Sequence, residues 1–431
     1  MNEFVVGVSI FALVYIGIIS EKINKTVVAL LGAMTMLSLH VLDQAEAFNA
    51  IDLNVVFLLV GMMIIVHIMS KTGVFQWGAI KVAQLAKGEP LKMLIYLSCV
   101  SAVISAFLDN VTTMILMVPV LLLLCDELEL DPIPFLLMTV IASNIGGAAT
   151  LVGDPPNILI GSAAGLNFND FLINLAPVII IISIVFIFTL KVMFADKFHV
   201  STEIRARVME MRADKAIRNY PLLWKSLGVL GSAIILFLCH HIIGLEAATV
   251  ALLGASVLLL ISKEDPEEVF KHVEWVTLFF FVGLFIIVEG LVKIGFIELL
   301  ANYALDITDG QLTLTTMLLL WFSAIFSAII DNIPYTATMI PLVKHMGVSM
   351  SQSYGVAPDM ILRPLWWALA LGACLGGNGT SIGASANVLV IGLAKKTGHH
   401  ISFLRFLKYG SIFVLESLVI STIYLYIRYL M

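Results

Sequence analysis

The sequence predicts an all-α polytopic membrane protein that is built from an inverted repeat, and three observations support this fold class. Of the 431 residues, 60% are hydrophobic and only 13% are charged. Soluble globular chains carry about 25% charged residues. Long apolar runs recur along the whole chain, and a membrane-spanning helix needs about 20 such residues. Segments of the first half also return in the second half at a nearly constant spacing.

Composition also excludes several classes of function. The net charge is −6 and no dense basic patch exists, so nucleic acid is not an expected partner. The four cysteines are scattered singly without a CxxC pair, which argues against a disulfide framework or a zinc site. The sequence contains no nucleophile–base pair, metal cluster or cofactor motif. We therefore expect neither an enzyme nor a cofactor.

The apolar runs and one polar segment give the domain organisation. Ten membrane crossings of about 20 residues fit the chain with room for irregular segments. The one long polar segment carries eight Lys/Arg and four acids between Lys191 and Lys225, which predicts a cytoplasmic location. We expect a first repeat at 1–194, a cytoplasmic linker at 195–222 and a second repeat at 223–431. The apolar stretches lie at about 4–20, 27–42, 54–70, 93–125, 134–165, 172–194, 223–243, 246–262, 275–292, 312–343, 363–393 and 409–430.

Direct comparison of the two halves supports the repeat. A shift of 222 residues places Val55–Gly73 on Thr277–Gly295 with eight identities in nineteen positions. The same shift places SAFLDNVTTMILMVP on SAIIDNIPYTATMIP with six identities in fifteen. A shift of 230 places GGAATLVGDPPNILI on GGNGTSIGASANVLV, again with six in fifteen. Apolar composition raises chance identity, but it does not supply matching Asp-Asn, Gly-Gly, Thr and Asn residues.

The run Met93–Cys125 determines the handedness of the repeat. Its 33 residues would make a helix of about 50 Å, too long for a hydrocarbon core of about 30 Å. The polar pair Asp109-Asn110 lies in its middle, which predicts a re-entrant hairpin with a protein-buried tip. Each half then has five crossings, and an odd number inverts the second half. Charge agrees, because the loop Lys71–Lys92 has four Lys and one Glu, whereas Lys293–Gly310 has one Lys and three acids.

The candidate site consists of four polar, Gly-rich interruptions at membrane depth, two hairpin tips and two broken crossings. Half-helix ends at such interruptions point partial charges into a shared midplane cavity, as in inverted-repeat transporters. We expect these four elements to face one cavity that binds substrate or ion. The candidate residues are Asp109, Asn110, Thr112, Thr113, Asn144, Gly146, Gly147, Thr150, Asp154 and Asn157 in the first half, and Asp331, Asn332, Thr336, Asn378, Gly379, Thr380, Ser385 and Asn387 in the second.

Several of these residues also have purely structural interpretations. Asp154 precedes two prolines and could be the N-cap of a half-helix instead of a ligand. Asn157 and Asn387 could form interhelical hydrogen bonds. Asp109 and Asp331 are the strongest functional candidates, because an intramembrane carboxylate is costly. Burial opposes their ionisation, so we expect the pair to exchange protons and to couple transport to the proton gradient.

Five blocks of the sequence resemble a known family. These blocks are AFLDNVTTMILMVPV, SNIGGAATLVGDPPNILIGSAAGL, VEWVTLFFFVGLFIIVEGL, IDNIPYTATMIPLV and GACLGGNGTSIGASANVLV. They are similar to the signature blocks of the arsenite permease/P-protein branch of the ion transporter superfamily, and the resemblance covers nearly the whole chain.

The resemblance implies a secondary transporter with the elevator-type fold of that superfamily. It implies a homodimer, in which each protomer has a scaffold and a mobile domain with two opposed hairpins. Dicarboxylate carriers of the superfamily bear Ser-Asn-Thr at the tips. Here Asn110 and Asn332 match the Asn, but Asp109 and Asp331 replace the Ser, which argues against a dicarboxylate. The expected location is a bacterial or archaeal cytoplasmic membrane, with a soluble ATPase as a further partner if the protein is an arsenite pump.

Three transport hypotheses follow, with a channel as a fourth. The first is proton-coupled efflux of arsenite or antimonite, because arsenite at neutral pH is mostly the uncharged As(OH)₃ and the expected cavity contains no Lys or Arg. The second is a sodium/proton antiporter, with Na⁺ bound at the hairpin tips and H⁺ as the exchanged ion. The third is a sodium- or proton-coupled carrier of an organic anion. A channel is less compatible with two inverted hairpins, which favour an occluded site.

Overall fold

The computed structural model describes residues 3–431 except 21, 196, 199 and 240–243. The described residues are helical without a β-strand, and nine of their helices are long and apolar enough to cross a membrane. The predicted linker at 195–222 includes two positions, 196 and 199, that lie outside the described residues.

The helices of the first half are α1 (Glu3–Ser20), α2 (Lys25–Ser38), α3 (Gln44–Asn49), α4 (Leu53–Ser70), α5 (Val74–Leu85), α6 (Pro90–Ser105), α7 (Asn110–Glu127), α8 (Pro132–Gly147), α9 (Pro155–Ala164), α10 (Phe168–Asn174) and α11 (Ala176–Phe194). The linker contains α12 (Thr202–Glu210) and the 3₁₀ turn η1 (Ala213–Ala216). The helices of the second half are α13 (Tyr220–Leu238), α15 (Ala247–Ser262), α16 (Pro266–Phe270), α17 (Trp275–Lys293), α18 (Phe296–Ile307), α19 (Leu312–Ile329), α20 (Asn332–Tyr354), α21 (Pro358–Gly376), η2 (Gly377–Gly379), α22 (Ser385–Lys396), α23 (Phe403–Leu425) and the terminal π turn η3 (Tyr426–Leu430).

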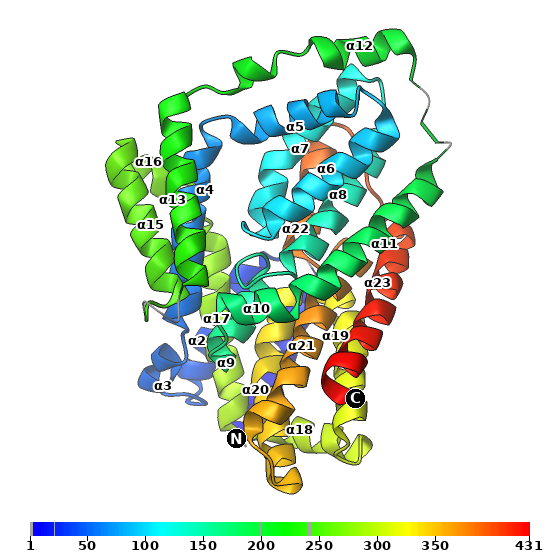
Figure 1. The fold of residues 1–431 in the computed structure, drawn as a ribbon. Helices are drawn as coiled ribbons and strands as arrows, with labels where there is room; N and C mark the ends of the chain where they lie inside the picture. Colours follow the sequence, from blue (N-terminus) through cyan, green and yellow to red (C-terminus); the bar gives the residue numbers. More distant parts are fainter. Residues whose placement is uncertain (1–2, 21, 196, 199, 240–243) are drawn as a thin grey trace.

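The helix boundaries repeat with the spacing found in the sequence. Helices α2, α4, α5, α6 and α7 begin 222 residues before α15, α17, α18, α19 and α20, respectively. The backbone repeats as well, because Gly73 and Gly295 both precede their helices in the left-handed region, at φ 82° and 76°. Figure 1 shows α5 at the upper end of the molecule and its counterpart α18 at the lower end. The two halves are therefore inverted, as predicted.

The helices form two groups, and each group takes helices from both halves (Figure 1). The first group, which we call the scaffold, contains α1–α4, α13 and α15–α17. In it α2 packs on α17 and α4 packs on α15, so each of these pairs joins a helix of one half to a helix of the other. The glycines Gly61 and Gly283 permit both contacts, because a Cβ atom there would lie 2.6 and 2.8 Å from the backbone of Ala251 and Ala29, respectively. A difference of 222 again relates the two glycines and the two alanines.

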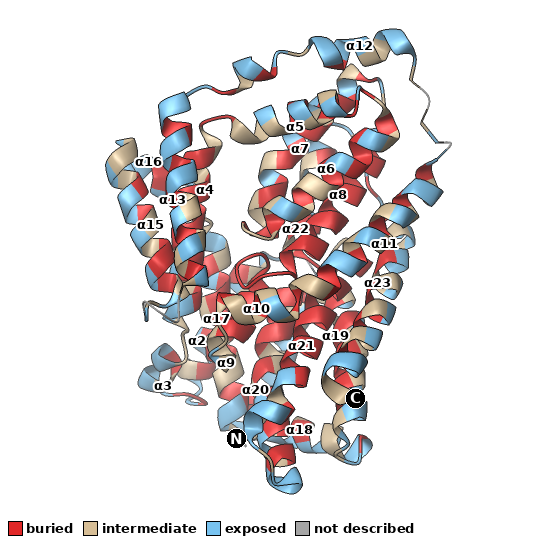
Figure 2. Cartoon of the chain, in the orientation of Figure 1, coloured by how far each residue is buried: buried red, intermediate tan, exposed pale blue. Residues whose placement is uncertain are grey.

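The second group, which we call the hairpin domain, contains α6–α11 and α19–α23. In it α6 packs on α8 and α19 packs on α21. Helices α6 and α7 form the first re-entrant hairpin, with its tip at 106–109, and α19 and α20 form the second, with its tip at 330–331. Figure 2 shows that the centre of this domain is the most buried part of the protein, and all sixteen residues of α8 are buried. Helices α5 and α18 connect the scaffold to the hairpins at opposite ends (Figure 1).

The linker lies against α5, which places the two on one side of the molecule (Figure 1). The side-chain amide of Gln84 in α5 donates to the carbonyl of Met211 in the linker at 2.7 Å. The backbone N–H of Arg218 donates to the carbonyl of Thr72 at 2.9 Å. Because both segments carry an excess of Lys and Arg, the positive-inside tendency predicts that this common side is cytoplasmic.

Cysteine labelling tests this orientation. Lys87 follows α5 and Asp309 follows α18, and both side chains are exposed. In a variant without the four native thiols, Lys87→Cys is expected to react with an impermeant maleimide from the cytoplasmic side and Asp309→Cys from the outside. Labelling of both positions from the same side would contradict the inverted topology.

Candidate functional site

The candidate site centres on a cavity of about 610 Å³ between the scaffold and the hairpin domain. Asp109 and Asp331, from the two hairpin tips, both line it. The scaffold contributes Lys25 from the start of α2 and Glu274 from the residue before α17. The cavity therefore contains three carboxyl groups and one ammonium group, all at the boundary between the two groups of helices.

Asp331 is held by three polar contacts. Its Oδ1 accepts the backbone N–H of Ile333 at 3.1 Å, so it caps the N-terminus of α20. Its Oδ2 forms an ion pair with Lys25 Nζ at 2.6 Å and accepts the hydroxyl of Ser385 at 2.7 Å. Lys25 also donates to Ser385 Oγ at 2.8 Å, which closes a triangle of three side chains. The expectation that the cavity contains no Lys or Arg is wrong.

Asp109, the counterpart of Asp331, has no such ion pair among the described residues. Its Oδ1 accepts the backbone N–H of Thr112 at 2.8 Å and caps α7, while its Oδ2 accepts the hydroxyl of Thr112 at 2.5 Å. Glu274 lines the same cavity from the scaffold. Asp109 is 8% exposed and Asp331 is 5% exposed, so both carboxyl groups are largely removed from water.

Asp154 connects the two hairpin tips. Its Oδ1 accepts the side-chain amides of Asn110 and Asn332, both at 3.3 Å. The two amide nitrogens are therefore much closer together than two helix diameters, and the hairpin tips meet at one point as the repeat predicts. The side chain of Asp154 is fully buried and makes no capping hydrogen bond to α9. Its position favours a role in the site over the alternative role as a helix cap.

Three further asparagines extend this network into the second broken crossing. Asn110 donates to Asn144 Oδ1 at 3.0 Å. Asn144 in turn donates to Asn378 Oδ1 at 2.9 Å and to Asn387 Oδ1 at 3.0 Å. All of these side chains are buried. The network thus links both hairpin tips and both broken crossings, although its members come from four segments of the chain.

The two broken crossings are each held by a threonine and an asparagine, and the repeat relates all but one pair of their contacts. Thr150 donates its hydroxyl to the carbonyl of Ala106 in the first tip, and Thr380 donates to Ala328 at 2.5 Å. Asn157 donates to the carbonyls of Ala148 and Thr150 at 3.2 and 2.9 Å; Asn387 donates to Gly377 and Thr380 at 2.8 and 2.9 Å. These bonds satisfy carbonyl groups that a broken helix leaves free. They favour a structural role for the two asparagines.

Of the eighteen predicted residues, only Asp109, Asp331 and Ser385 line the cavity, and the others lie inside the hairpin domain. The hydroxyls of Thr113 and Thr336 are buried and have no hydrogen-bond partner among the described residues. Glycines 146, 147 and 379 pack against neighbouring backbone or side-chain atoms, where a Cβ atom would lie within 2.8 Å of another atom. Their function is to allow close approach of helices and loops.

Sequence reasoning missed Lys25 and Glu274. Lys25 lies at the first position of an apolar helix, where a lysine ordinarily reaches toward the membrane surface. Its counterpart by the 222-residue shift is Ala247, so the repeat comparison does not identify it. Glu274 has Asp52 as its counterpart, and both precede an apolar run like ordinary helix-start residues.

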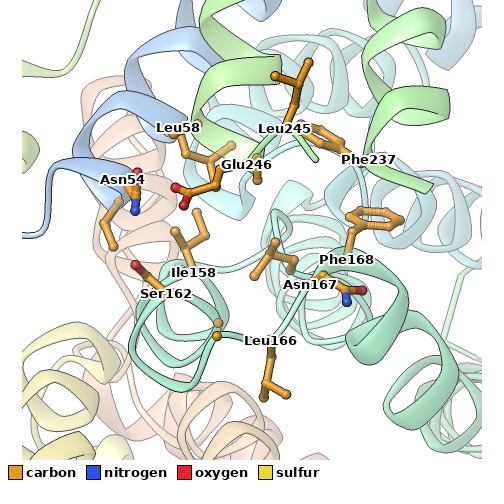
Figure 3. Close-up of a pocket in the computed structure, with 16 residues that line it drawn as sticks. Asn54, Leu58, Ile158, Ser162, Leu166, Asn167, Phe168, Phe237, Leu245 and Glu246 are labelled. Carbon is orange, nitrogen blue, oxygen red and sulfur yellow. The ribbon is translucent and has the colours of Figure 1, made fainter. Parts of the chain in front are cut away.

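A second, smaller cavity of about 200 Å³ is related to the first by the repeat. Its wall includes Asn54 and Glu246 of the scaffold and Ile158 of α9 (Figure 3). The counterparts of these three residues are Val276, Asn24 and Val388, which line the larger cavity. Two pseudo-symmetric cavities of unequal volume therefore lie between the hairpin domain and the scaffold.

Comparison with known proteins identifies the family. The sequence profile of the citrate transporter family, CitMHS, matches residues 15–372. The chain belongs to the citrate transporter family. An uncharacterized transporter of Mycobacterium tuberculosis strain H37Rv is 46% identical over 99% of the chain and 98% of its own length. The mouse P protein is 35% identical over 98% of the chain, which spans 60% of the P protein.

A solved structure supports the same architecture for this member of the citrate transporter family. The YdaH transporter of Alcanivorax borkumensis, described as having an unusual topology, superposes with a TM-score of 0.61 over 99% of both chains at 13% identity. The likeness confirms the predicted fold. Family and relatives together show an integral membrane protein that is a transporter and not an enzyme. They confirm the resemblance to the P protein, whereas a specific relation to arsenite permeases stays a prediction.

Proposed function

We propose that this transporter is a proton-coupled secondary carrier of a small inorganic solute, and that it works by an elevator movement of the hairpin domain against the scaffold. One observation carries the proposal: Asp109 and Asp331 of the hairpin domain share a cavity with Lys25 and Glu274 of the scaffold. Carboxyl groups at membrane depth ordinarily mark ion or proton pathways. Because these carboxyl groups lie at the domain boundary, their neighbouring groups would change when the hairpin domain moves against the scaffold.

The charge of the cavity restricts the solute. With all groups ionised, three carboxylates and one ammonium give a net charge of −2. Such a cavity repels a dicarboxylate or tricarboxylate anion, because like charges at short range in a low dielectric are strongly unfavourable. It accommodates protons, small cations and uncharged solutes. Lys25 does not reverse this preference, since Asp331 and Ser385 already hold its ammonium group.

Arsenous or antimonous acid is the solute that we propose first. As(OH)₃ is uncharged near neutral pH and both donates and accepts hydrogen bonds. Asn110 and Asn332 directly follow the cavity-lining Asp109 and Asp331 in the sequence, so their side-chain amides, which Asp154 accepts, bring hydrogen-bond donors and acceptors close to the cavity. Outward movement of this solute in exchange for protons would make the protein an efflux carrier.

A sodium/proton antiporter is the second candidate, and the excess of carboxylates is the observation that favours it. Hard cations such as Na⁺ bind to carboxylate, carbonyl and hydroxyl oxygens, which is the chemistry that Mg²⁺ and Ca²⁺ also prefer. Asp109, with the hydroxyl of Thr112 beside it, offers such oxygens. In this case Na⁺ and H⁺ would compete for the same carboxyl groups.

The two unequal cavities support the elevator movement. In an inverted repeat, exchanging the conformations of the halves gives a second state in which the smaller cavity becomes the larger one. A polar contact that the movement must break lies on the boundary: Tyr15 of α1 donates its hydroxyl to the carbonyl of Pro334 at 2.7 Å. We also propose that the carrier is a homodimer, with the scaffold as the stationary part.

Flux measurements in proteoliposomes test the proposed function. We expect a pH gradient to drive saturable movement of arsenite, and arsenite addition to dissipate the gradient. If the protein is the antiporter instead, Na⁺ will dissipate the gradient and arsenite will not move. Saturable citrate transport with neither response would contradict the charge argument, and large non-saturating currents would indicate a channel.

A further inference from the structure

The two tip aspartates occupy repeat-related positions, but their surroundings differ in one charge. Asp331 contacts Lys25 and Ser385. The counterparts of these two residues, by shifts of 222 and 230, are Ala247 and Pro155, which can supply neither an ammonium nor a hydroxyl group to Asp109. The two halves of the repeat therefore differ at Lys25, whose ammonium group pairs with Asp331 and has no equivalent beside Asp109.

The ion pair between Lys25 and Asp331 crosses the boundary between the scaffold and the hairpin domain. Lys25 begins α2, which packs on α17 of the scaffold, and its ammonium also lies 5.0 Å from the ring centroid of Phe280 in α17. Asp331 and Ser385 belong to the second hairpin tip and the second broken crossing. The lysine is thus fixed on one side of the boundary and its two polar partners on the other.

We propose that Lys25 is a built-in competitor for the proton or cation at Asp331, and that it promotes release of this coupling ion in the state described by the structure. The inference rests on the proposed function, since it assigns a task to one residue at the same site. Lys25 acts through Asp331 and is therefore a positioning residue. This role requires no contact between Lys25 and the solute.

The group that neutralises Asp331 differs between the two states of the transporter. A carboxylate that moves through the low-dielectric part of the membrane with the hairpin domain needs a neutralising partner. In the described state that partner is Lys25. After the domains move apart, the ammonium stays with the scaffold, so Asp331 must carry a proton or bind a cation. On return, the ammonium takes the place of that ion and the ion leaves.

The other charged groups near Asp331 do not replace Lys25. Asp109 and Glu274 line the same cavity, and Asp154 accepts the side-chain amide of Asn332, the residue next to Asp331. All three are carboxyl groups. Each of them, when ionised, repels the Asp331 carboxylate, whereas Lys25 is the charged group of the described cavity that attracts it. Removing the ammonium should therefore leave Asp331 with carboxyl groups as its only charged neighbours among the residues described around the cavity.

Infrared titration of the purified protein tests the proposal without any transport assay. The variants are Lys25→Met, Lys25→Arg and the double variant Lys25→Met/Asp331→Asn. We expect Lys25→Met to keep a protonated-carboxyl C=O band to a pH at least about one unit higher than the parent, as loss of an adjacent positive charge predicts. Lys25→Arg should retain the parental titration, and the double variant should lose the added band.

A matched control separates this effect from a general loss of an ion pair. Lys71 pairs with Glu264 at 2.6 Å, and its side chain is 33% exposed, against 31% for Lys25. Lys71 and Glu264 both lie at the ends of scaffold helices, α4 and α15, so Lys71→Met should leave the carboxyl band unchanged. The inference is overturned if Lys25→Met titrates like the parent, or if the new band persists in the double variant.

Transport measurements then connect the inference to the proposed function. In proteoliposomes, half-maximal exchange by Lys25→Met should move to a pH higher by about the same amount as the infrared band. If the parental protein shows no proton-coupled flux at all, the proposed function fails. The infrared result still decides whether Lys25 controls the protonation of Asp331.

Discussion

Asp109→Asn and Asp331→Asn are each expected to leave a folded protein whose proton-driven flux falls to the level of empty liposomes. Asparagine has nearly the same shape as aspartate but cannot exchange a proton at neutral pH. Both aspartates cap a hairpin helix, and asparagine is an equally good N-cap residue. The caps should therefore survive while the titratable group is lost. Flux between pH 5.5 and 8.5 and the melting temperature in detergent measure the two effects separately.

The alternative is that the two aspartates serve only as caps, and alanine variants distinguish the roles. If capping is the whole role, Asp109→Ala should lower the stability by about 0.5–2 kcal/mol, while the asparagine variants transport with the parental pH profile. If both asparagine variants transport with the parental pH profile, the two aspartates do not couple transport to protons. A somewhat larger loss of stability is expected for Asp331→Asn than for Asp109→Asn, because it leaves Lys25 without its carboxylate partner.

Gly146→Ala is expected to cause a large loss of stability. In α8, a Cβ atom at this position would lie 2.0 Å from the carbonyl oxygen of Ala102 and 2.5 Å from its Cα in α6. These are backbone atoms of a packed helix, so relief requires the first hairpin to move away from α8. Overpacking of this kind costs about 1–3 kcal/mol, or more where backbone must shift. Gly376→Ala should act similarly, since its Cβ atom would lie 2.4 Å from Ala324.

Gly392→Ala is the matched control. Gly392 also lies in a helix of the hairpin domain, α22, but no atom lies within 4 Å of a Cβ built there. An alanine in a helix interior gains about 0.5–1 kcal/mol over glycine, so the melting temperature should be unchanged or higher. Elution profiles and melting temperatures of the variants provide the measurement. Equal stability of Gly146→Ala and Gly392→Ala would show that α6 and α8 do not pack as closely as described.

Much of the candidate site was predictable because it follows from local pattern and repetition. Asp109 and Asp331 stand beside asparagines in apolar segments, and each glycine-rich break has a counterpart at a fixed spacing. Inversion then requires the two tips to meet near the pseudo-two-fold axis. The role of Asp154 was not decided by its place before two prolines, since that pattern also fits a helix cap. The contacts from Asn110 and Asn332 show instead that Asp154 joins the two hairpin tips.

The sequence by itself thus determined the membrane class, the inverted repeat and the two hairpins, because apolar length, helix-breaking residues and recurring motifs are properties of short segments. Only the tertiary structure decided that Lys25 joins the site, since the lysine and Asp331 are 306 residues apart and no repeat relates Lys25 to another charge. It also decided that α2 packs on α17 and α4 on α15. Pairing of charges and helices between distant segments depends on the shape and close packing of the whole fold, which short sequence patterns do not contain.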